Sequence, residues 1–241
     1  MSDLEALDDS GFERVLVVVA HPDDAEYGLS AAVARWTAAG AAVTYLLISA
    51  GEAGMQLPPA EVAPLRAEEQ RRACETVGVS DLRILDFPDG TIEHGLPLRQ
   101  AIARAIRDVR PDVVVTPTPE LEPGWGINHA DHRAVGLATY DAVRDADNTW
   151  VFPELARTED LPKWGATWLL VSGHTQPTHY ADVTGEPLQK GIDSLACHEA
   201  YLAELPGHPR PEEFLPQMTS GLGEQVGVGN AVGFRAYRLK D

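Results

Sequence analysis

The sequence predicts an α/β fold: a doubly wound, Rossmann-like and mostly parallel sheet with helices on both faces, extended by C-terminal strands. Two observations lead to this prediction. Short β-branched apolar runs alternate with helix-like segments of about 10–15 residues, which is the pattern of βαβ units. The run Val-Leu-Val-Val-Val at 15–19 is continuously apolar, as in a strand covered on both faces. Right-handed crossovers then make the sheet doubly wound.

The first four segments follow this alternation. The run at 14–20 predicts a strand, and the Ala-rich stretch at 29–39, which a glycine ends, predicts a helix. The run Ala-Val-Thr-Tyr-Leu-Leu-Ile at 42–48 predicts a second strand. Glycines and two adjacent prolines predict a loop over 49–64.

The next four segments continue the pattern. A glycine stops the helix expected at 65–77, and the turn Pro88-Asp89-Gly90 closes the strand expected at 82–87. A helix is expected at 96–109 and a short β-branched strand at 112–116.

Beyond residue 149 the pattern loosens. Strands are expected at 166–171, 178–183 and 231–239, and a helix at 188–205. The stretch 206–229 holds four prolines and five glycines, so we expect a long loop there.

Length, composition and charge bound the classes of function. With 241 residues, 44% of them apolar, and no clear linker or internal repeat, we expect one domain over 1–241. The 19 basic and 37 acidic residues give a net charge of −18, which repels nucleic acid and anionic membranes. No run approaches the roughly 18 apolar residues of a membrane span, and no secretory signal is recognised. We therefore expect a cytoplasmic protein with no nucleic-acid or membrane partner, and the sequence leaves a homo-oligomer open. The two cysteines, Cys74 and Cys197, are expected to be free thiols.

The most informative motif is His21-Pro22-Asp23-Asp24, which directly follows the first strand. In open α/β sheets, ligands bind in the crevice beyond the C-terminal ends of the strands. A histidine, a carboxylate three positions on and a histidine on a distant loop provide three ligands for a divalent ion. We assign His21, Asp24 and His132 as these ligands. Such donors suit Zn²⁺, with Fe²⁺, Mn²⁺ or Ni²⁺ as alternatives, and catalytic zinc keeps three protein ligands.

Asp23 is then a carboxylate beside the ion that is not needed as a ligand. Such a group can take a proton from a water that the ion activates. The alternative is a structural carboxylate that caps a helix beginning near Ala25. The position of Asp23 between two assigned ligands favours the catalytic base.

The second motif is Asn128-His129-Ala130-Asp131-His132, at the start of a helix expected to run to Arg144. His129 and His132 are three apart and share a helix face, so both can face one site. Asp131 can hydrogen-bond an imidazole and set its tautomer, and Asn128 is a candidate N-cap. By itself this motif is equally consistent with a solvated helix start.

The two motifs are stronger evidence for one metal site if they lie close together in the fold. If the strand at 112–116 lies beside the strand at 14–20, their outgoing loops flank the point where the sheet reverses direction. That arrangement brings His132 close to His21.

Together the two motifs resemble those of the PIG-L/LmbE family of metal-dependent N-acetylglucosaminyl deacetylases. This family includes deacetylases and amidases of mycothiol and bacillithiol metabolism and GlcNAc-PI de-N-acetylases. Three further segments are similar to family motifs and occur in the expected order: Ser49–Gly54, Arg66–Glu69 and Phe87–Gly90. The resemblance covers roughly residues 12–200.

The resemblance implies a doubly wound fold, usually Zn²⁺, and hydrolysis of an acetamide on an amino sugar. It implies the same ligands, His21, Asp24 and His132. It further implies that Asp23 is the base and that His129 faces the developing oxyanion.

The resemblance also implies two substrate contacts, and this chain differs from the family pattern at two positions. Arg66 and Asp89 would contact the sugar. Some family members have a tyrosine two residues before His-x-Asp-His, where this chain has Ile127. Many have a glutamate directly after the first motif, whereas here Ala25 intervenes before Glu26. Glu26 either supports the site from one position later or serves the first turn of the helix.

Two other residues keep two interpretations each. His198 falls where the family often has a histidine, and either packs in the core or supports the site. Trp125 either stacks on a sugar or packs its own loop.

These observations predict a zinc-dependent amidohydrolase that removes acetyl from an N-acetylglucosamine-type amide, with Asp23, His129 and Asp131 as catalytic residues. The alternative is an amidase of a larger thiol- or antibiotic-type conjugate at the same site. A different class is a non-catalytic sugar- or nucleotide-binding domain. The glycine-rich phosphate loop of a nucleotide-binding domain is missing after the first strand, and binding alone needs neither Asp23 nor His129.

Overall fold

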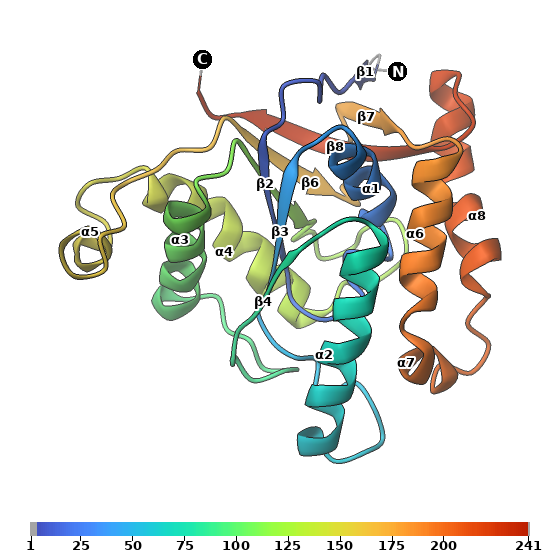
Figure 1. The fold of residues 1–241 in the computed structure, drawn as a ribbon, viewed down its shortest axis with the longest axis horizontal. Helices are drawn as coiled ribbons and strands as arrows, with labels where there is room; N and C mark the ends of the chain where they lie inside the picture. Colours follow the sequence, from blue (N-terminus) through green and yellow to red (C-terminus); the bar gives the residue numbers. More distant parts are fainter. Residues whose placement is uncertain (1–3, 241) are drawn as a thin grey trace.

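The computed structural model describes residues 4–240 and shows one eight-stranded sheet (Figure 1). The strand order is β1-β7-β8-β6-β5-β2-β3-β4. The strands are β1 (Glu5–Ala6), β2 (Arg14–Val19), β3 (Ala42–Leu47), β4 (Asp81–Ile84), β5 (Val113–Pro117), β6 (Trp168–Ser172), β7 (His179–Asp182) and β8 (Ala231–Arg238). The strand pairs are parallel except where β8 pairs with β6 and β7. The predicted fold class is therefore confirmed.

The helices lie on both faces of the sheet. They are α1 (Ser30–Ala38), α2 (Pro59–Thr76), α3 (Leu96–Val109), α4 (Ala130–Ala146), α5 (Pro153–Thr158), α6 (Glu186–Ala196), α7 (Glu199–Ala203) and α8 (Pro211–Val226). In Figure 1, α1, α2 and α6 lie on one side of the strands and α3 and α4 on the other. Among residues 4–240, no helix combines the length and apolar character needed to cross a membrane.

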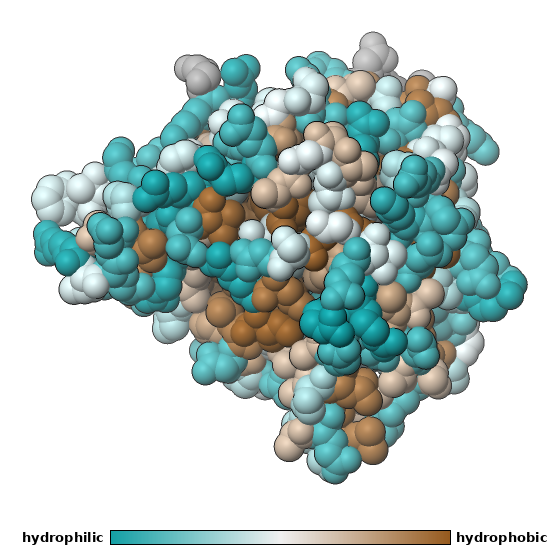
Figure 2. Space-filling view, in the orientation of Figure 1, coloured by the Kyte–Doolittle hydropathy of each residue, from teal (hydrophilic) through white to brown (hydrophobic). Residues whose placement is uncertain are grey.

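Figure 2 shows hydrophilic residues over most of one face, with apolar side chains visible between them near the β4 edge of the sheet. Partly buried Leu82 and Ile84 belong to this edge strand.

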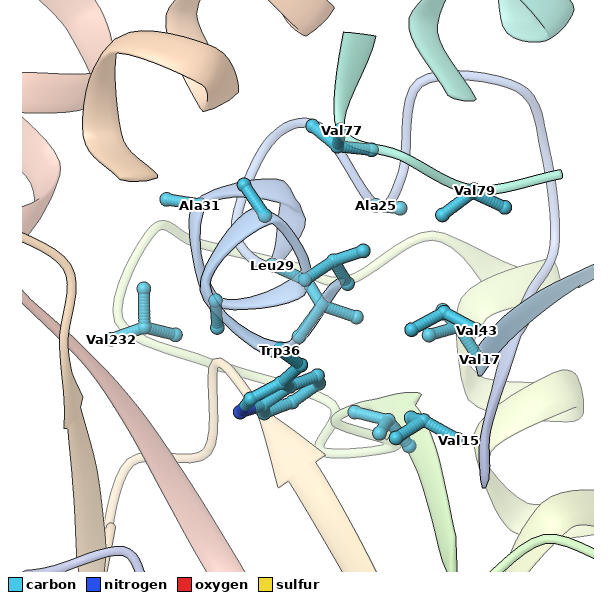
Figure 3. Packing of buried hydrophobic residues seen from close by; sticks show 14 of the residues in the cluster. Val15, Val17, Ala25, Leu29, Ala31, Trp36, Val43, Val77, Val79 and Val232 are labelled. Carbon is cyan, nitrogen blue, oxygen red and sulfur yellow. The ribbon is translucent and has the colours of Figure 1, made fainter. Parts of the chain in front are cut away.

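Alternate residues of β2 point into two separate cores. Val15 and Val17 pack with α1, where Trp36 fills the space under the sheet (Figure 3). Leu16 and Val18 pack against α3 and α4 on the other face. Burial on both sides explains why the β2 sequence is continuously apolar.

The order of the strands creates a reversal beside β2. The chain passes from β2 to β3 and β4 in one direction, and then returns to place β5 on the other side of β2. Val15 pairs with Val113 and Val17 with Val115, so the two strands end at the same edge of the sheet. The loops that leave β2 and β5 therefore flank one crevice, which meets the condition stated from the sequence.

Two segments predicted as loops are partly helical. Helix α2 begins at Pro59 and contains Pro64, and α8 covers most of 206–229 with Pro216 inside it. Leu215, Thr219 and Gly223, spaced by four residues, form the buried side of α8. Packing of this face outweighs the hydrogen bond that the internal proline removes.

Three further elements differ from the prediction. The helix expected at 188–205 is divided into α6 and α7, with Cys197 and His198 between them. Strand β1 and helix α5 were not predicted. Both are short, and short elements carry little periodic signal.

Candidate active site

The structure brings the two histidine motifs together at the C-terminal ends of β2 and β5. The ring centroids of His21 and His132 are 5.2 Å apart, and those of His21 and His129 are 5.3 Å apart. These residues come from segments separated by more than a hundred positions in the sequence. Their meeting depends on the pairing of β2 with β5.

Asp24 lies between His21 and His132. One carboxylate oxygen is 3.0 Å from His132 Nε2, and the other is 3.7 Å from His21 Nδ1. The backbone N–H groups of Ala20 and His21 donate to Asp24 Oδ2 at 3.0 and 2.9 Å. The strand end thus fixes the carboxylate between the two imidazoles.

The charges at this cluster suit a divalent cation. Burial lowers the pKa of His21, but the Asp24, Asp131 and Asp89 carboxylates outweigh burial and raise that pKa to about 12. Burial raises the pKa of Asp24, but the His132 and His21 imidazoles outweigh it and hold that pKa well below its usual range. Convergent imidazole and carboxylate donors in a strongly acidic setting fit a Zn²⁺-type ion, which would replace the imidazole protons.

His129 is a geometric alternative to Asp24 within this cluster. His21, His129 and His132 offer ring nitrogens within 4.8 Å of one another. However, His129 Nδ1 accepts the backbone N–H of Asp131 at 3.3 Å, which assigns its proton to Nε2. Burial, His21 and His132 lower the pKa of His129, so the neutral ring is favoured and its Nε2–H is a free donor.

His129, not Asn128, is the N-cap of α4, which corrects the sequence prediction. Asn128 instead orients His132: its Oδ1 is 3.2 Å from His132 Nδ1. Its Nδ2 donates to the carbonyls of Thr118 and Glu120 at 2.8 and 3.0 Å. The buried amide therefore turns His132 Nε2 toward Asp24.

Asp131 contacts His21 across the crevice. Its Oδ2 is 3.2 Å from His21 Nε2, and the backbone N–H groups of Gly90 and Ile92 donate to its two oxygens at 2.7 and 3.1 Å. Asp89 Oδ1 is also 2.9 Å from His21 Nε2. With Nε2 occupied in this way, Nδ1 of His21 is the nitrogen that faces Asp24. Carboxylates commonly orient metal-binding histidines like this.

Asp23 is nearly buried, with 4% of its surface exposed, and its backbone is left-handed at φ 85°. Its Oδ1 is 3.1 Å from Arg66 Nη2. Burial raises the pKa of Asp23 to about 7, against the opposing charge of Arg66. A carboxylate with a pKa near neutrality suits proton transfer. The capping alternative does not fit, because α1 begins at Ser30 and its N-cap is Leu29.

Arg66 lies beneath Asp23, with only 2% of its surface exposed. Its guanidinium donates to the carbonyls of Gly51 and Pro22 at 2.9 and 2.6 Å. A Cβ on Gly54 would lie 2.6 Å from Arg66 Nη1, so this glycine makes room for the guanidinium. The Arg66 guanidinium and the 51–54 loop therefore pack closely against each other.

Tyr201 on α7 completes the surroundings of Asp23 and was not singled out in the sequence. Arg66 Cζ lies 4.1 Å from the centroid of its ring. Burial and the facing Asp23 carboxylate raise the pKa of the Tyr201 hydroxyl above its usual range. No local spacing connects Tyr201 to Asp23, because the contact depends on the packing of α7.

Asp89 is held between His21 and the loop after β3. The backbone N–H of Ala53 donates to its Oδ2 at 2.7 Å, and its own N–H donates to Glu52 at 2.9 Å. Burial raises the pKa of Asp89, but the contact with His21 outweighs burial and lowers it. Arg66 and Asp89, the two expected sugar contacts, are thus both largely covered by protein.

The loop before α4 presents exposed apolar side chains. Trp125 is 59% exposed and Ile127 80% exposed, although both lie within four residues of His129. A Cβ on Gly173 would lie 2.7 Å from the Trp125 ring, so this glycine leaves space for the indole.

Comparisons with known proteins identify the family of this chain. The family model "PIG-L: GlcNAc-PI de-N-acetylase" matches residues 16–143. The diacetylchitobiose deacetylase of Thermococcus kodakarensis is 36% identical over 198 residues, which cover 80% of this chain and 71% of that protein. A probable N-acetyl-alpha-D-glucosaminyl L-malate deacetylase 2 of Bacillus anthracis is 27% identical over 238 residues, covering 95% of this chain and 96% of that protein.

A solved structure agrees at the level of the fold. The N,N'-diacetylchitobiose deacetylase from Pyrococcus horikoshii superposes with a TM-score of 0.82 at 21% identity, covering 95% of this chain and 85% of that one. The family match includes both the His-Pro-Asp-Asp motif and the His-x-Asp-His motif. The chain therefore belongs to the PIG-L family of GlcNAc-PI de-N-acetylase-like proteins.

Proposed function

We propose that this protein is a metal-dependent deacetylase that hydrolyses the acetamide of an N-acetylglucosamine-type substrate. The observation that carries the proposal is the convergence of His21, Asp24 and His132, with the buried Asp23 carboxylate beside them. Family membership and the deacetylase names of its relatives support the reaction class.

The proposed ligands are His21, Asp24 and His132, and the proposed ion is Zn²⁺. Fe²⁺, Mn²⁺ and Ni²⁺ accept the same donors. When bound, the ion supplies a Lewis acid that polarises a carbonyl and lowers the pKa of a water. Asp131 and Asn128 hold the two imidazoles in the orientation that this requires.

The remaining chemistry falls to this chain's own residues. Asp23 takes a proton from the attacking water and can return it to the leaving amine. The Nε2–H of neutral His129 donates to the oxyanion that develops on the former carbonyl oxygen. One such donor commonly contributes about 3–4 kcal/mol to transition-state stabilisation.

The substrate contacts are proposed from the resemblance alone. The resemblance gives Arg66 and Asp89 as contacts for sugar hydroxyl groups, and because protein covers most of both side chains, such contacts require the loops around them to open. We further propose that residues 1–241 act as one cytoplasmic domain on a small amino-sugar molecule.

A metal analysis combined with an acetate-release assay tests the proposal. Purified protein should contain about one divalent ion per chain. It should release acetate from N-acetylglucosamine derivatives such as N,N'-diacetylchitobiose or N-acetylglucosaminyl malate. A chelator should abolish release, and added Zn²⁺ should restore it. Metal binding without acetate release, but with amine release from larger acylated conjugates, would favour the amidase alternative and reject the deacetylase.

A further inference from the structure

A buried polar cluster lies behind Asp23, outside the metal-binding residues. It joins the turn after β2 to α2 and α6, and its members are buried almost completely: Glu26, Gln70, Ser194 and His198. Such polar groups are costly in a core unless they are paired with one another. The proposed mechanism so far uses none of them.

Gln70 is the member that reaches the catalytic region. The backbone N–H of Asp23 donates to Gln70 Oε1 at 2.9 Å. On the other side, the Asp23 carbonyl accepts the N–H groups of Glu26 and Tyr27 at 2.8 and 3.1 Å. The backbone of Asp23 is thus held at both of its polar groups.

This restraint matters because Asp23 has an uncommon conformation. A residue with a Cβ at φ 85° is disfavoured by sterics, although aspartate tolerates it better than most residues. The left-handed backbone turns the Asp23 carboxylate toward Arg66 while the next residue, Asp24, faces the imidazoles. Without the Gln70 acceptor, the Asp23 N–H would be buried without a protein partner.

Glu26 determines which end of the Gln70 amide faces Asp23. Gln70 Nε2 donates to the two Glu26 oxygens at 3.2 and 3.3 Å. A carboxylate accepts only, so it selects the NH₂ end of the amide and leaves the oxygen for Asp23. Ser194 Oγ donates to Glu26 Oε1 at 3.3 Å, and His198 Nε2 lies 3.5 Å from Glu26 Oε2 without hydrogen-bond geometry.

We propose that Gln70, oriented by Glu26, is a positioning residue that holds Asp23 in the left-handed conformation needed for proton transfer. This inference rests on the proposed function, in which Asp23 is the base. It assigns to Glu26 the support that the sequence left open, with Gln70 as the link between Glu26 and the site.

The test compares turnover, KM and metal content of Gln70→Met with two reference variants. Methionine has a similar volume but accepts no strong hydrogen bond from the Asp23 N–H. We expect kcat to fall roughly 10- to 100-fold, with KM and the bound metal near wild type. Ser194→Ala is the matched control, because Ser194 is buried in the same cluster and contacts Glu26 but not Asp23. It should keep the wild-type kcat.

Asp23→Asn provides the second reference. If Gln70 acts through Asp23, adding Gln70→Met to Asp23→Asn should cause no further loss of the residual rate. Equal losses in the wild-type and Asp23→Asn backgrounds would show a general structural effect and overturn the inference. Wild-type turnover of Gln70→Met with an inactive Asp23→Asn would also overturn it, but would leave the proposed function intact. A metal-loaded Asp23→Asn with full activity would instead reject the base assignment itself.

An exchanged pair keeps the test decisive if Gln70→Met does not fold. Gln70→Glu places two carboxyl groups together, and at a pH high enough to ionise both, their repulsion should separate them and slow turnover, so the comparison is made at that pH. Combining it with Glu26→Gln restores both hydrogen bonds with the two groups exchanged: the amide now at position 26 can donate to the carboxylate now at position 70, which still accepts the Asp23 N–H. Recovery of kcat in the double variant supports the inference. A double variant as slow as Gln70→Glu alone contradicts it.

Discussion

Replacing Asn128 with alanine should lower both the stability of the fold and the affinity of the site for metal. All three side-chain hydrogen bonds of Asn128 contribute to stability, whereas only the bond to His132 contributes to metal affinity. Asn128 is buried and its side chain makes three hydrogen bonds: two from Nδ2 to the carbonyls of Thr118 and Glu120, and one between Oδ1 and His132 Nδ1. At about 1 kcal/mol for each bond, Asn128→Ala should lower the free energy of unfolding of the metal-free protein by about 3 kcal/mol. Loss of the His132 contact should also weaken metal affinity by roughly 10- to 100-fold.

The assay pairs urea unfolding of the metal-free protein with zinc competition against a chromogenic chelator. Thr118→Val is the matched control, because Thr118 Oγ1 bonds to Glu120 in the same loop but does not contact His132. It removes two hydrogen bonds and should therefore cost about 2 kcal/mol of stability, while leaving zinc affinity unchanged. Equal zinc affinities for Asn128→Ala, Thr118→Val and wild type would refute the orienting contact between Asn128 and His132.

Three further outcomes are expected. Asp23→Asn should retain the metal, measured by elemental analysis, but lose about 10²- to 10⁴-fold in kcat, which is the usual contribution of a general base; wild-type turnover would contradict this. Gly54→Ala should lower kcat and displace Arg66, because the new Cβ would lie 2.6 Å from Arg66 Nη1, and a crystal structure with Arg66 unmoved would argue against it. Arg107→Leu should lower the unfolding free energy by about 5 kcal/mol, at about 1 kcal/mol for each hydrogen bond lost, without changing kcat. The buried guanidinium donates only to carbonyls between residues 145 and 152, at the opposite end of α4. A change in kcat with unchanged stability would be inconsistent with this structural assignment.

The positions of the candidate metal ligands could be predicted because each is tied to a regular element. The apolar run of β2 places His21 at a strand end, and the helical spacing of His129 and His132 places both at the first turn of α4. The convergence of the two motifs was conditional on β5 lying beside β2, and the structure shows this pairing. Local patterns together with this one pairing bring His21 and His132 into one crevice.

The support of the site could not be predicted in the same way. Asp131 contacts His21 across the crevice, and Gln70 reaches Asp23 from α2, which are contacts between remote segments. Asparagine is a residue type that favours N-cap positions, but the side-chain amide of Asn128 instead forms hydrogen bonds with two loop carbonyls and with His132. Hydrogen-bond partners of this kind depend on tertiary packing that a periodic pattern does not encode.

The same limit applies to α7 and α8. Prolines and glycines predict a loop over 206–229, yet the buried face of α8 stabilises a helix around Pro216. The break between α6 and α7 at Cys197 and His198 was also missed, and with it the placement of Tyr201 over Arg66.

The most direct measurement of the central claim is the location of the ion by anomalous diffraction from zinc-loaded crystals. We predict one peak about 2.0–2.2 Å from a ring nitrogen of His21, a ring nitrogen of His132 and an oxygen of Asp24, with Asp23 uncoordinated. A peak ligated by Asp23, or an ion that does not bridge His21 and His132, would contradict the assignment of ligands and base together.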